Sequence, residues 1–387
     1  MAPPVQFDII CCSLEPWDEV WRRNQHLTAE LLRLRPTMRV LFVEPPIDLA
    51  WSLRQGRWPA ASGLRSIGDS GRLWARAPRK WLPRRIWPNG DRSLVRQVMA
   101  TSNRLGLDRP LLWINDSLYA PLAESTGWPS VYDVTDDWLL GAGGEREMER
   151  LRDNDARILR VATEVVVCSP ALEDSRGRER SVHLVSNGVD VDHLRAPTVR
   201  PTDLPAGRIV LYQGTLVDGR LDVDLCVATA RRVAPDATLV LVGPNSLTRP
   251  SSQSLIGAGA LVLGSRPYDD LPAYLQHADV LVVPHRVNSF TESLDPIKAR
   301  EFLSVGRPVV ATPVAGFRDL DPPIAVAAAA AFPEVVAAVL ARPPLSPGPG
   351  ELVGEPATWA AQAARFLAVL DAAASRRSAP SGEELRS

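Results

Sequence analysis

One stretch of the C-terminal half, residues 288–313, reads NSFTESLDPIKAREFLSVGRPVVATP. A polar loop ends there at Pro296, and a proline followed by good helix formers predicts that a helix begins at about Ile297. The free N–H groups and the dipole of a helix start favour a phosphate in front of it. Lys298 adds a positive charge in the first turn, and Glu301 lies one turn further on the same face, where its carboxylate can accept from two ribose hydroxyls. Phosphate and ribose together indicate a nucleotide, whereas ordinary helix capping and a surface charge pair explain the same residues without a ligand.

Short apolar runs alternate with helical stretches on both sides of this segment, which predicts parallel sheets with crossover helices. The expected strands of the first half are residues 7–12, 40–43, 111–114, 130–134 and 164–168, with helices at 21–34 and 145–160. The second half repeats the alternation at 208–213, 221–233, 238–242, 261–263, 271–277, 280–283, 297–303 and 308–311. We therefore expect two α/β units.

The length of the chain, 387 residues, also favours two domains, because a single core rarely grows beyond about 250–300 residues. The segment 196–207, rich in proline and polar residues, is the expected linker. We expect an N-terminal domain at residues 1–190, a C-terminal domain at 191–357, a last helix at 358–375 and a disordered tail at 376–387.

Composition argues against several functional classes. The chain has 44 Lys and Arg against 45 Asp and Glu, a balance that disfavours a dedicated nucleic-acid binder. No apolar run approaches the ~18 residues of a membrane-spanning helix, and the N-terminus lacks a signal-peptide pattern, so we expect a cytoplasmic protein. The four cysteines and five histidines lack metal-ligand spacing, so we expect no metal and no bound cofactor. No G-x-G-x-x-G follows the first strand, which disfavours a Rossmann dehydrogenase.

Several motifs occur in order around the segment 288–313. They are WRRNQHLTAELLRL and VLFVEPP, then YDVTDDW, SNGVD, YQGTL, VGP, GSRPYDDLPAYLQHADVLVVP and the TWAAQ of the last helix. Together with P-x-K-x-x-E-F-L-x-x-G-x-P-V-V-A-T they resemble retaining GT-B glycosyltransferases related to family 4, or group 1, of the teichuronic-acid and exopolysaccharide type. The resemblance spans most of the chain. It implies two Rossmann-like, doubly wound domains that face a central cleft, with a C-terminal helix that crosses back to the N-terminal domain.

The resemblance also implies a nucleotide-sugar donor site in the C-terminal domain. The residues assigned to it are Gly214, Thr215, Arg220, Gly243, Arg266, Tyr268, Ser293, Leu294, Asp295, Pro296, Ile297, Lys298 and Glu301. Arg220 and Lys298 would stabilise the departing diphosphate, which needs positive charge when no metal serves. Many relatives carry a second glutamate eight positions before the one that matches Glu301, where this chain has Ser293. We expect Ser293, Asp295 or backbone amides to meet the donor sugar instead, so the identity of that sugar does not carry over.

Polar residues of the N-terminal half are candidates for the acceptor side and for catalysis. They are Arg23, Gln25, His26, Asp133, Asp136 and Asp137. The aspartates follow a strand end, where open α/β sheets place ligands, and Asp136 or Asp137 can orient or deprotonate an acceptor hydroxyl. The same pair can instead cap the next segment. His26 is a candidate catalytic or acceptor contact, and a hydrogen-bonded structural histidine is an equally open interpretation.

The segment 51–96 holds five tryptophans and about eleven basic residues against two acidic ones. Arginine and tryptophan together suit a membrane surface, a lipid-linked or anionic acceptor, or stacking on a sugar. Solvated loops with scattered tryptophan anchors are the alternative. We expect a peripheral contact with the inner face of a membrane through this segment.

The expected activity is transfer of a sugar from a nucleoside-diphosphate sugar to an acceptor hydroxyl, with retention, in polysaccharide, glycolipid or natural-product biosynthesis. Two alternatives stay open. One is a GT-B hydrolase or epimerase of nucleotide sugars, and the other is a catalytically silent, nucleotide-sugar-binding partner of another transferase.

Overall fold

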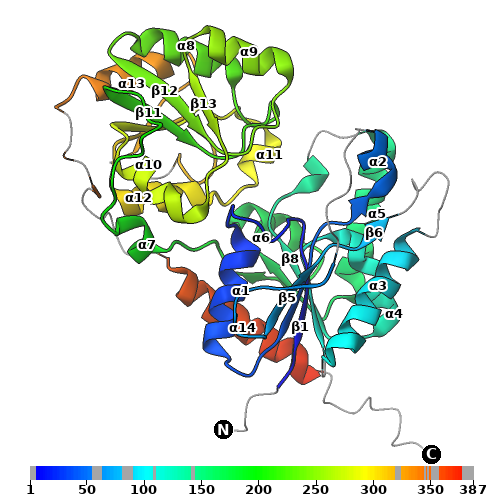
Figure 1. The fold of residues 1–387 in the computed structure, drawn as a ribbon. Coiled ribbons are helices and arrows are strands. Elements are labelled where there is room, and N and C mark those ends of the chain that lie inside the picture. Colours follow the sequence, from blue (N-terminus) through cyan, green and yellow to red (C-terminus); the bar gives the residue numbers. More distant parts are fainter. Residues whose placement is uncertain are drawn as a thin grey trace, which may run out of the picture. The chain divides into compact units, whose positions relative to one another are not determined.

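The structure, a computed structural model, describes residues 6–54, 63–80, 90–107, 110–140, 144–318, 324–343, 346, 348–349 and 357–376. The chain divides into two compact units, coloured blue to green with red, and green to orange, in Figure 1. Unit 1 comprises Met1–Ser186 and Ala360–Ser387, and unit 2 comprises Asn187–Trp359.

The division of the chain differs from the expected one in two respects. It falls after Ser186, four residues before the expected boundary, and the expected linker at 196–207 lies wholly within unit 2. The linker prediction is wrong because Leu204 is buried and Arg200 donates to the carbonyl oxygen of Pro205 at 2.7 Å, so this proline-rich segment packs on its own unit. Residues 377–387 of the expected tail lie outside the described residues.

Unit 1 is built on a largely parallel sheet with helices on both faces. The strands of unit 1 are β1 (Ile9–Cys12), β2 (Val40–Val43), β3 (Ile47–Asp48), β4 (Arg65–Ser66), β5 (Leu73–Arg76), β6 (Arg79–Lys80), β7 (Leu111–Ile114), β8 (Ser130–Val134), β9 (Glu164–Val167) and β10 (His183–Leu184), of which β3 and β6 pair with each other outside the main sheet. Its helices are α1 (Arg23–Leu34), α2 (Leu49–Arg54), α3 (Gly90–Leu105), η1 (Ser117–Tyr119), α4 (Ala120–Thr126), η2 (Trp138–Leu140), α5 (Glu145–Val161), α6 (Pro170–Arg176) and α14 (Trp359–Arg376), the last assigned to unit 1 from Ala360.

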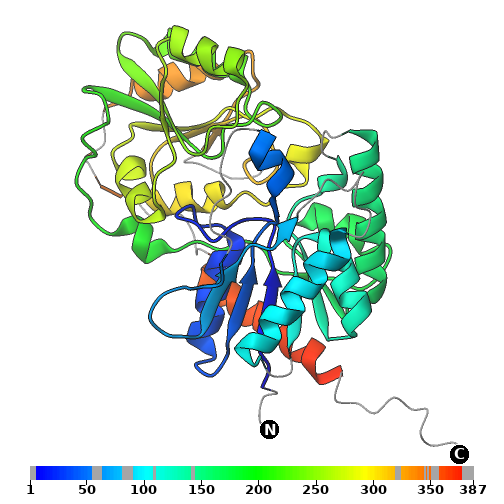
Figure 2. The ribbon, with the colours of Figure 1, turned by 45° about the vertical axis from the view of Figure 1, so that its right-hand side comes forward.

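The main sheet of unit 1 has the strand order β10-β9-β8-β7-β1-β2-β5-β4, in which only β4 is antiparallel to its neighbour among the described strands. The central strands are continuous apolar runs because both of their faces are covered. Helices α1 and α14 cover one face, and α3 and α4 cover the other (Figures 1 and 2). The α14 side chains Ala363, Phe366 and Leu370 are fully buried at helical spacing. Phe366 packs on Trp113 of β7 with ring centroids 4.8 Å apart, which anchors the last helix to this sheet.

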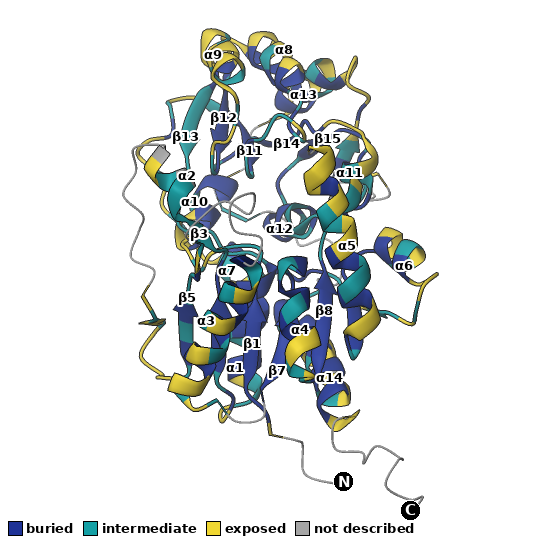
Figure 3. Cartoon of the chain, turned by 90° about the vertical axis from the view of Figure 1, so that its right-hand side faces the viewer, coloured by how far each residue is buried: buried dark blue, intermediate teal, exposed yellow. Residues whose placement is uncertain are grey.

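Unit 2 has a six-stranded parallel sheet of order β13-β12-β11-β14-β15-β16. The strands are β11 (Arg208–Gln213), β12 (Ala237–Val242), β13 (Leu261–Gly264), β14 (Val280–Val283), β15 (Val309–Ala311) and β16 (Ile324–Val326). The helices are α7 (Val191–Arg195), α8 (Val223–Val233), α9 (Arg249–Gly257), η3 (Tyr268–Asp270), α10 (Leu271–Gln276), α11 (Ser289–Glu292), α12 (Ile297–Val305) and α13 (Phe332–Leu340). Figure 3 shows the central strands of each unit as a buried layer between helices whose outer faces are exposed, while the edge strand β13 is only partly buried. Both units are thus doubly wound sheets, as predicted, and ligands of such sheets bind beyond the carboxyl ends of the strands.

Candidate functional site

The carboxyl ends of β11 and β12 meet through two glycines. Gly243 has φ 145°, and a Cβ there would lie 2.0 Å from the carbonyl oxygen of Gly214. Gly214 donates its N–H to the carbonyl oxygen of Val242 at 2.9 Å, and its own φ is 156°. The close approach of these backbones requires glycine at 243 and leaves the strand ends free of side chains. Thr215 follows, and its carbonyl oxygen lies 3.4 Å from the Tyr212 hydroxyl.

The loop after Gly214 carries Arg220 and is tied to the segment that follows β14. The carbonyl oxygen of Arg220 accepts from the N–H of Arg286 at 2.8 Å, and Asp222 donates its N–H to Pro284 at 2.9 Å. The Nε of Arg220 is buried without a hydrogen-bond partner, and no carboxylate of the described residues pairs with its guanidinium. The loop therefore fixes the position of Arg220, and its guanidinium forms no ion pair with the described residues.

A buried histidine, His285, follows β14 after one proline, and its pKa responds to the charges of two predicted cations. Its Nε2 is 3.2 Å from the hydroxyl of Tyr212, and its N–H and carbonyl oxygen bond the Thr312 hydroxyl at 3.2 and 2.8 Å. Burial, and then the charges of Arg220 and Lys298, lower the pKa of His285 to about 3. The charges of both cations therefore act on the same imidazole, although the two residues lie far apart in the sequence.

The sequence alone showed His285 only as one of five scattered histidines, and we did not predict that it belongs to the candidate site. The available signal was its position immediately after the buried run VLVV of β14, because ligand-facing residues follow the strands of such sheets.

Helix α12 begins at Ile297, as predicted, and presents Lys298 and Glu301 together. The Lys298 Nζ lies 3.3 Å from Glu301 Oε2, and the Glu301 side chain is only 8% exposed. Burial, followed by the charges of Glu301 and Asp190, raises the pKa of Tyr268. A helix start with a cation and a nearly buried carboxylate offers complementary groups to a phosphate and to hydroxyls.

Three of the predicted donor residues fix the loop in front of α12. Asp295 accepts from the N–H of Asn187 and from Arg300 Nη1, both at 2.7 Å. Ser293 donates its hydroxyl to the carbonyl oxygen of Phe290 at 2.8 Å. The Pro296 ring packs against Gly316. A Cβ at position 316 would lie 2.4 Å from this ring, so only glycine fits there. Ser293 and Asp295 therefore both help to hold this loop, and Leu294 lies partly buried between the two.

Arg266 and Tyr268, also predicted to bind the donor, are occupied by their own unit. Arg266 donates to the Tyr274 hydroxyl at 2.8 Å, to Asp203 at 2.5 Å and to two backbone carbonyl groups. Tyr268 is buried and stacks on His193, with ring centroids 4.3 Å apart. Arg266 thus fixes the segment that contains Asp203, and His193 covers one face of the Tyr268 ring.

Two acceptor-side candidates of unit 1, Arg23 and Asp133, form a buried ion pair. Arg23 Nε and Nη2 donate to the two carboxylate oxygens of Asp133 at 3.1 and 3.0 Å, and Trp113 Nε1 donates to the same carboxylate at 3.2 Å. Asp133 is fully buried and Arg23 is 4% exposed. This pair is therefore part of the polar core of unit 1, with the Asp133 carboxylate held by Arg23 and Trp113.

The other candidates of unit 1 have mixed environments. Gln25 is buried in a capping box at the start of α1, where its Oε1 accepts from the N–H of Arg22 at 3.1 Å. Asp137 pairs with the buried Arg176 at 3.3 Å. His26 is buried against Trp21, with ring centroids 5.1 Å apart, while Asp136 is partly exposed. Of the predicted acceptor and catalytic carboxylates, Asp136 is the one that stays accessible.

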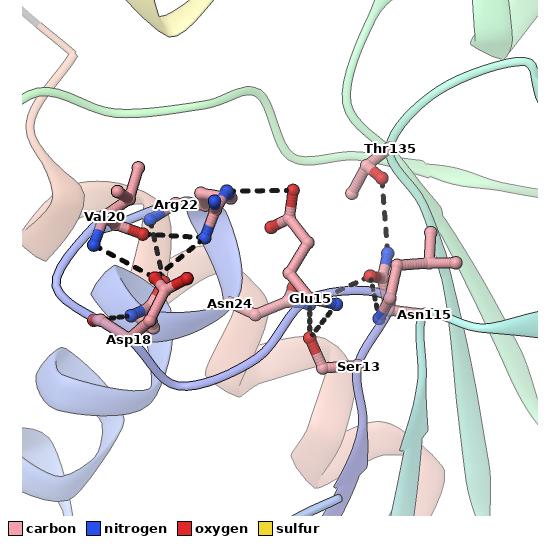
Figure 4. A network of polar contacts seen from close by, with 10 residues as sticks. Ser13, Glu15, Asp18, Val20, Arg22, Asn24, Asn115 and Thr135 are labelled. Atoms are coloured by element: carbon pink, nitrogen blue, oxygen red, sulfur yellow. Dashed lines mark hydrogen bonds and ion pairs between the residues drawn. The ribbon is translucent and has the colours of Figure 1, made fainter. Parts of the chain in front are cut away.

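A polar network lies beyond the carboxyl ends of β1 and β7, where the strand order of unit 1 reverses (Figure 4). Asn24 Nδ2 donates to the Ser13 hydroxyl and to Asn115 Oδ1, both at 2.9 Å. Asn115 Nδ2 in turn donates to Thr135 Oγ1 at 3.2 Å, and Glu15 pairs with Arg22 at 3.2 Å. Sequence reasoning did not name this cluster, since isolated Ser and Asn residues carry no spacing signal.

The described residues contain no group of three or more side chains suited to hold a metal ion. None of their helices is long and apolar enough to cross a membrane.

Comparison with known proteins gives a sequence family for unit 2 and a fold for the chain. Residues 207–342 match the family described as Glycosyl transferases group 1. A putative teichuronic acid biosynthesis glycosyltransferase, TuaH of Bacillus subtilis (strain 168), is 26% identical over 223 residues, which cover 53% of this chain and 56% of TuaH. The match therefore spans about half the length of that relative.

Similar solved structures cover nearly the whole chain. A sucrose-phosphate synthase from Thermosynechococcus elongatus aligns with TM-score 0.63 and 20% identity, over 96% of this chain and 98% of its own. A trehalose-phosphate synthase from Burkholderia vietnamiensis has TM-score 0.62 and 14% identity, over 96% and 99%. Anabaena Alr3699/HepE in complex with UDP-glucose has TM-score 0.60 and 14% identity, over 96% and 99%. Residues 207–342 therefore form a glycosyltransferase group 1 domain, and the chain that contains it has the GT-B fold.

Proposed function

We propose that the chain is a glycosyltransferase that moves a sugar from a nucleoside-diphosphate sugar to an acceptor hydroxyl, with retention, in the biosynthesis of a polysaccharide, glycolipid or natural product. The observation that carries the proposal is the start of α12, where the Lys298 Nζ lies 3.3 Å from Oε2 of the nearly buried Glu301. The group 1 match over residues 207–342 supports it.

In the proposed reaction Arg220 and Lys298 hold the diphosphate with the N–H groups at the start of α12. Positive charge placed there lowers the barrier, because negative charge grows on the diphosphate as it leaves the sugar. His285 is held neutral behind these cations, so it adds hydrogen-bonding capacity without a third charge. Glu301 accepts the ribose hydroxyls, and Gly214 and Gly243 let the backbone approach the ligand. No metal or other cofactor is needed in this scheme.

The relatives support the nucleotide-sugar class without naming this donor. One similar structure holds UDP and another holds UDP-glucose. The relative TuaH is described as a teichuronic acid biosynthesis enzyme. The acceptor, which we assign to unit 1, has Asp136 as its candidate base.

The proposal is tested by supplying UDP-, GDP-, ADP- and dTDP-sugars and measuring the nucleoside diphosphate released, with and without hydroxyl acceptors. We expect release from one donor class, and a drop of about 10²–10³-fold when Arg220 or Lys298 is replaced by methionine. Release unchanged in both variants would contradict the site assignment. Free sugar from donor alone at full rate would favour the hydrolase alternative, and binding without turnover would favour the silent partner.

We further propose a peripheral contact of a cytoplasmic enzyme with an anionic membrane or acceptor through the segment 51–96. Residues 55–62 and 81–89, with Trp58, Trp81 and Trp87, lie outside the described part, as does the side chain of Trp51. Trp74 packs against the core of unit 1, so it is not part of such a surface. The exposed arginines of β6 and α3, Arg79, Arg92 and Arg96, support the proposal. Co-sedimentation with anionic but not neutral vesicles is the expected result, and equal recovery with both would contradict it.

A further inference from the structure

Gln213, the last residue of β11, lies where the strand order of the unit 2 sheet reverses. The strands that follow it in the sequence, β12 and β13, lie on one side of β11, whereas β14, β15 and β16 lie on the other. Ligands of such sheets bind beyond the carboxyl ends of the strands at this reversal. Because Gly214 comes next, Gln213 carries the last side chain of its strand. Its amide is thus placed where a ligand of unit 2 is expected.

The side-chain amide of Gln213 is buried with an unsatisfied oxygen. The residue is 6% exposed, and its Oε1 accepts a hydrogen bond from none of the described residues. Side chains alternate along a strand, and Tyr212 packs into the core that contains α8 and α13, so Gln213 lies on the opposite face, toward α10 and α12 (Figure 1). Its register partner Val242 is apolar and offers it no donor. An amide oxygen removed from water without a donor destabilises the fold.

A second buried glutamine of unit 2 shows how this side chain serves a fold. Gln276, the last residue of α10, is fully buried, and its Oε1 accepts from the Thr198 hydroxyl at 2.8 Å. Its Nε2 donates to the carbonyl oxygens of Leu194 and Ala196 at 2.8 and 2.7 Å. Buried amides are ordinarily satisfied in this way. Gln213 differs from Gln276 at the end of the sheet where ligands bind, so its oxygen is a candidate for completion by a ligand.

The connection from β11 to α8 leaves a second polar atom unsatisfied, the Nε of Arg220. This atom is a donor, whereas the Oε1 of Gln213 is an acceptor. A ligand that completes both must therefore present an acceptor together with an O–H or N–H group. The diphosphate of a nucleotide sugar carries no proton and offers acceptors alone. The ribose, the base and the sugar supply the O–H and N–H groups that the diphosphate lacks.

We infer that Gln213 is a specificity-determining residue of the donor site, whose Oε1 accepts a hydrogen bond from an O–H or N–H group of the nucleotide sugar. For the identity of the ligand this rests on the proposed function. The residue then distinguishes a nucleotide sugar from a bare diphosphate, which the cations alone cannot do. In the ligand-free chain its unsatisfied oxygen lowers the stability, and binding of the ligand removes that loss. Function and stability are thus opposed at this position.

Thermal unfolding of the ligand-free chain is the first test. Gln213→Met keeps the length of the side chain and removes the unsatisfied oxygen, so the Tm should rise by about 2–4 °C. Gln276→Met is the matched control: it leaves the Thr198 hydroxyl and two carbonyl groups without their partner, and should lower the Tm by at least about 4 °C. A fall in the Tm of Gln213→Met would overturn the inference, because the amide would then support the fold. Gln213→Leu, which also removes the amide, takes its place should the methionine variant express poorly.

Calorimetric titration with three probes is the second test. The probes are inorganic diphosphate, whichever of UDP, GDP, ADP and dTDP binds, and the glucose conjugate of that nucleotide. We expect wild type and Gln213→Met to bind inorganic diphosphate equally, and the variant to bind the glucose conjugate about tenfold more weakly. A similar loss for the nucleoside diphosphate places the donated hydrogen on the nucleoside, and a loss for the conjugate alone places it on the sugar. Equal affinities for all three probes, or an equal loss for inorganic diphosphate, would overturn the inference.

Arg220→Met separates this inference from the proposed function. It should weaken all three probes, inorganic diphosphate included, because it removes a charge that every diphosphate meets. If Arg220→Met binds all three like wild type while Gln213→Met does not, the cation assignment fails and the role of Gln213 stands. If no nucleotide binds the wild type, the proposed function fails, whereas the Tm values of Gln213→Met and Gln276→Met still decide whether the Gln213 amide serves the fold.

Discussion

Arg23 and Arg220 both follow the first strands of their parallel sheets, yet the two guanidinium groups are used in opposite ways. Arg23 is 4% exposed and forms two hydrogen bonds to the carboxylate of Asp133. Arg220 has a buried Nε without a partner and no described carboxylate beside it. A charge that is paired inside the fold stabilises the fold, whereas a charge held in place without a partner is available to an anionic ligand. We therefore interpret Arg23 as a residue that supports the fold and Arg220 as a candidate ligand contact, and substitutions at each test this difference.

The largest expected effect is that of Arg23→Met on stability. Removing the guanidinium leaves the Asp133 carboxylate buried without its cation, which should lower the free energy of unfolding by about 3–5 kcal/mol. Denaturant unfolding measures this. The matched control is Arg157→Met, since Arg157 and Glu124 form a pair with side chains 36% and 33% exposed. Loss of that surface pair should cost at most about 1 kcal/mol. An equal loss of unfolding free energy in both variants would show that the buried Arg23–Asp133 pair matters no more than a surface pair.

A second effect is the pH dependence contributed by His285. Its pKa falls from 6.5 to about 3 through burial and the charges of Arg220 and Lys298. Between these values the unfolded chain binds the proton and the folded chain does not, so the free energy of unfolding decreases as pH falls below about 6.5. Between pH 7 and pH 5 this contribution should fall by about 2 kcal/mol.

The stability advantage of wild type over His285→Gln should therefore shrink by that amount over the same pH interval. Tyr212→Phe keeps the histidine and serves as the control, which should follow the pH dependence of wild type. A constant difference between wild type and His285→Gln would show that the imidazole is not held neutral.

The third effect concerns the glycine contact at the strand ends of unit 2. In Gly243→Ala the new Cβ would meet the carbonyl oxygen of Gly214 at 2.0 Å, at φ 145°. We expect the free energy of unfolding to fall by more than about 1 kcal/mol. Gly219→Ala, with no atom within 4 Å of the added Cβ, should stay within about 0.5 kcal/mol of wild type. A free energy of unfolding unchanged in Gly243→Ala would contradict this, because it would show that the backbones at Gly214 and Gly243 can move apart.

The smallest stability effect belongs to Arg220→Met. Since the described protein gives this guanidinium no ion pair and leaves its Nε unsatisfied, its loss should change the free energy of unfolding by less than about 0.5 kcal/mol. Thermal or denaturant unfolding of Arg220→Met and Arg23→Met, measured side by side, compares the two free energies of unfolding directly. A cost near that of Arg23→Met would mean that Arg220 supports the fold.

Much of the fold follows from sequence because the central strands are continuous apolar runs. The bounds of β2, β7, β8, β11 and β14 agree with prediction, since both faces of a parallel sheet are covered and polar residues mark the strand ends. Strand β5, LWAR, which lies next to the edge strand β4, alternates between buried and partly exposed side chains and was not predicted. The short strands β10 and β16 carry too few residues for any pattern.

The candidate site was predictable only in part, because sequence shows which polar residues exist and not which of them pair. Lys298 and Glu301 were predicted from the helix start and Arg220 from the resemblance, and the structure brings Lys298 and Glu301 within 3.3 Å. Arg23 and Asp133 looked equally suited to a ligand, yet they lie 110 positions apart and meet in the core. Tertiary pairing of this kind leaves no local signal in a single sequence.

The central claim is that unit 2 binds a nucleoside diphosphate through Arg220, and calorimetric titration with UDP, GDP, ADP and dTDP tests it most directly. The account predicts that one of the four binds the wild type, and that Arg220→Met, folded and equally stable, binds it about 10²-fold more weakly because a charge-assisted contact to the diphosphate is lost. Arg231→Met, an exposed arginine on α8, should bind like wild type. Absence of binding to all four, or equal affinity in wild type and Arg220→Met, would contradict the account.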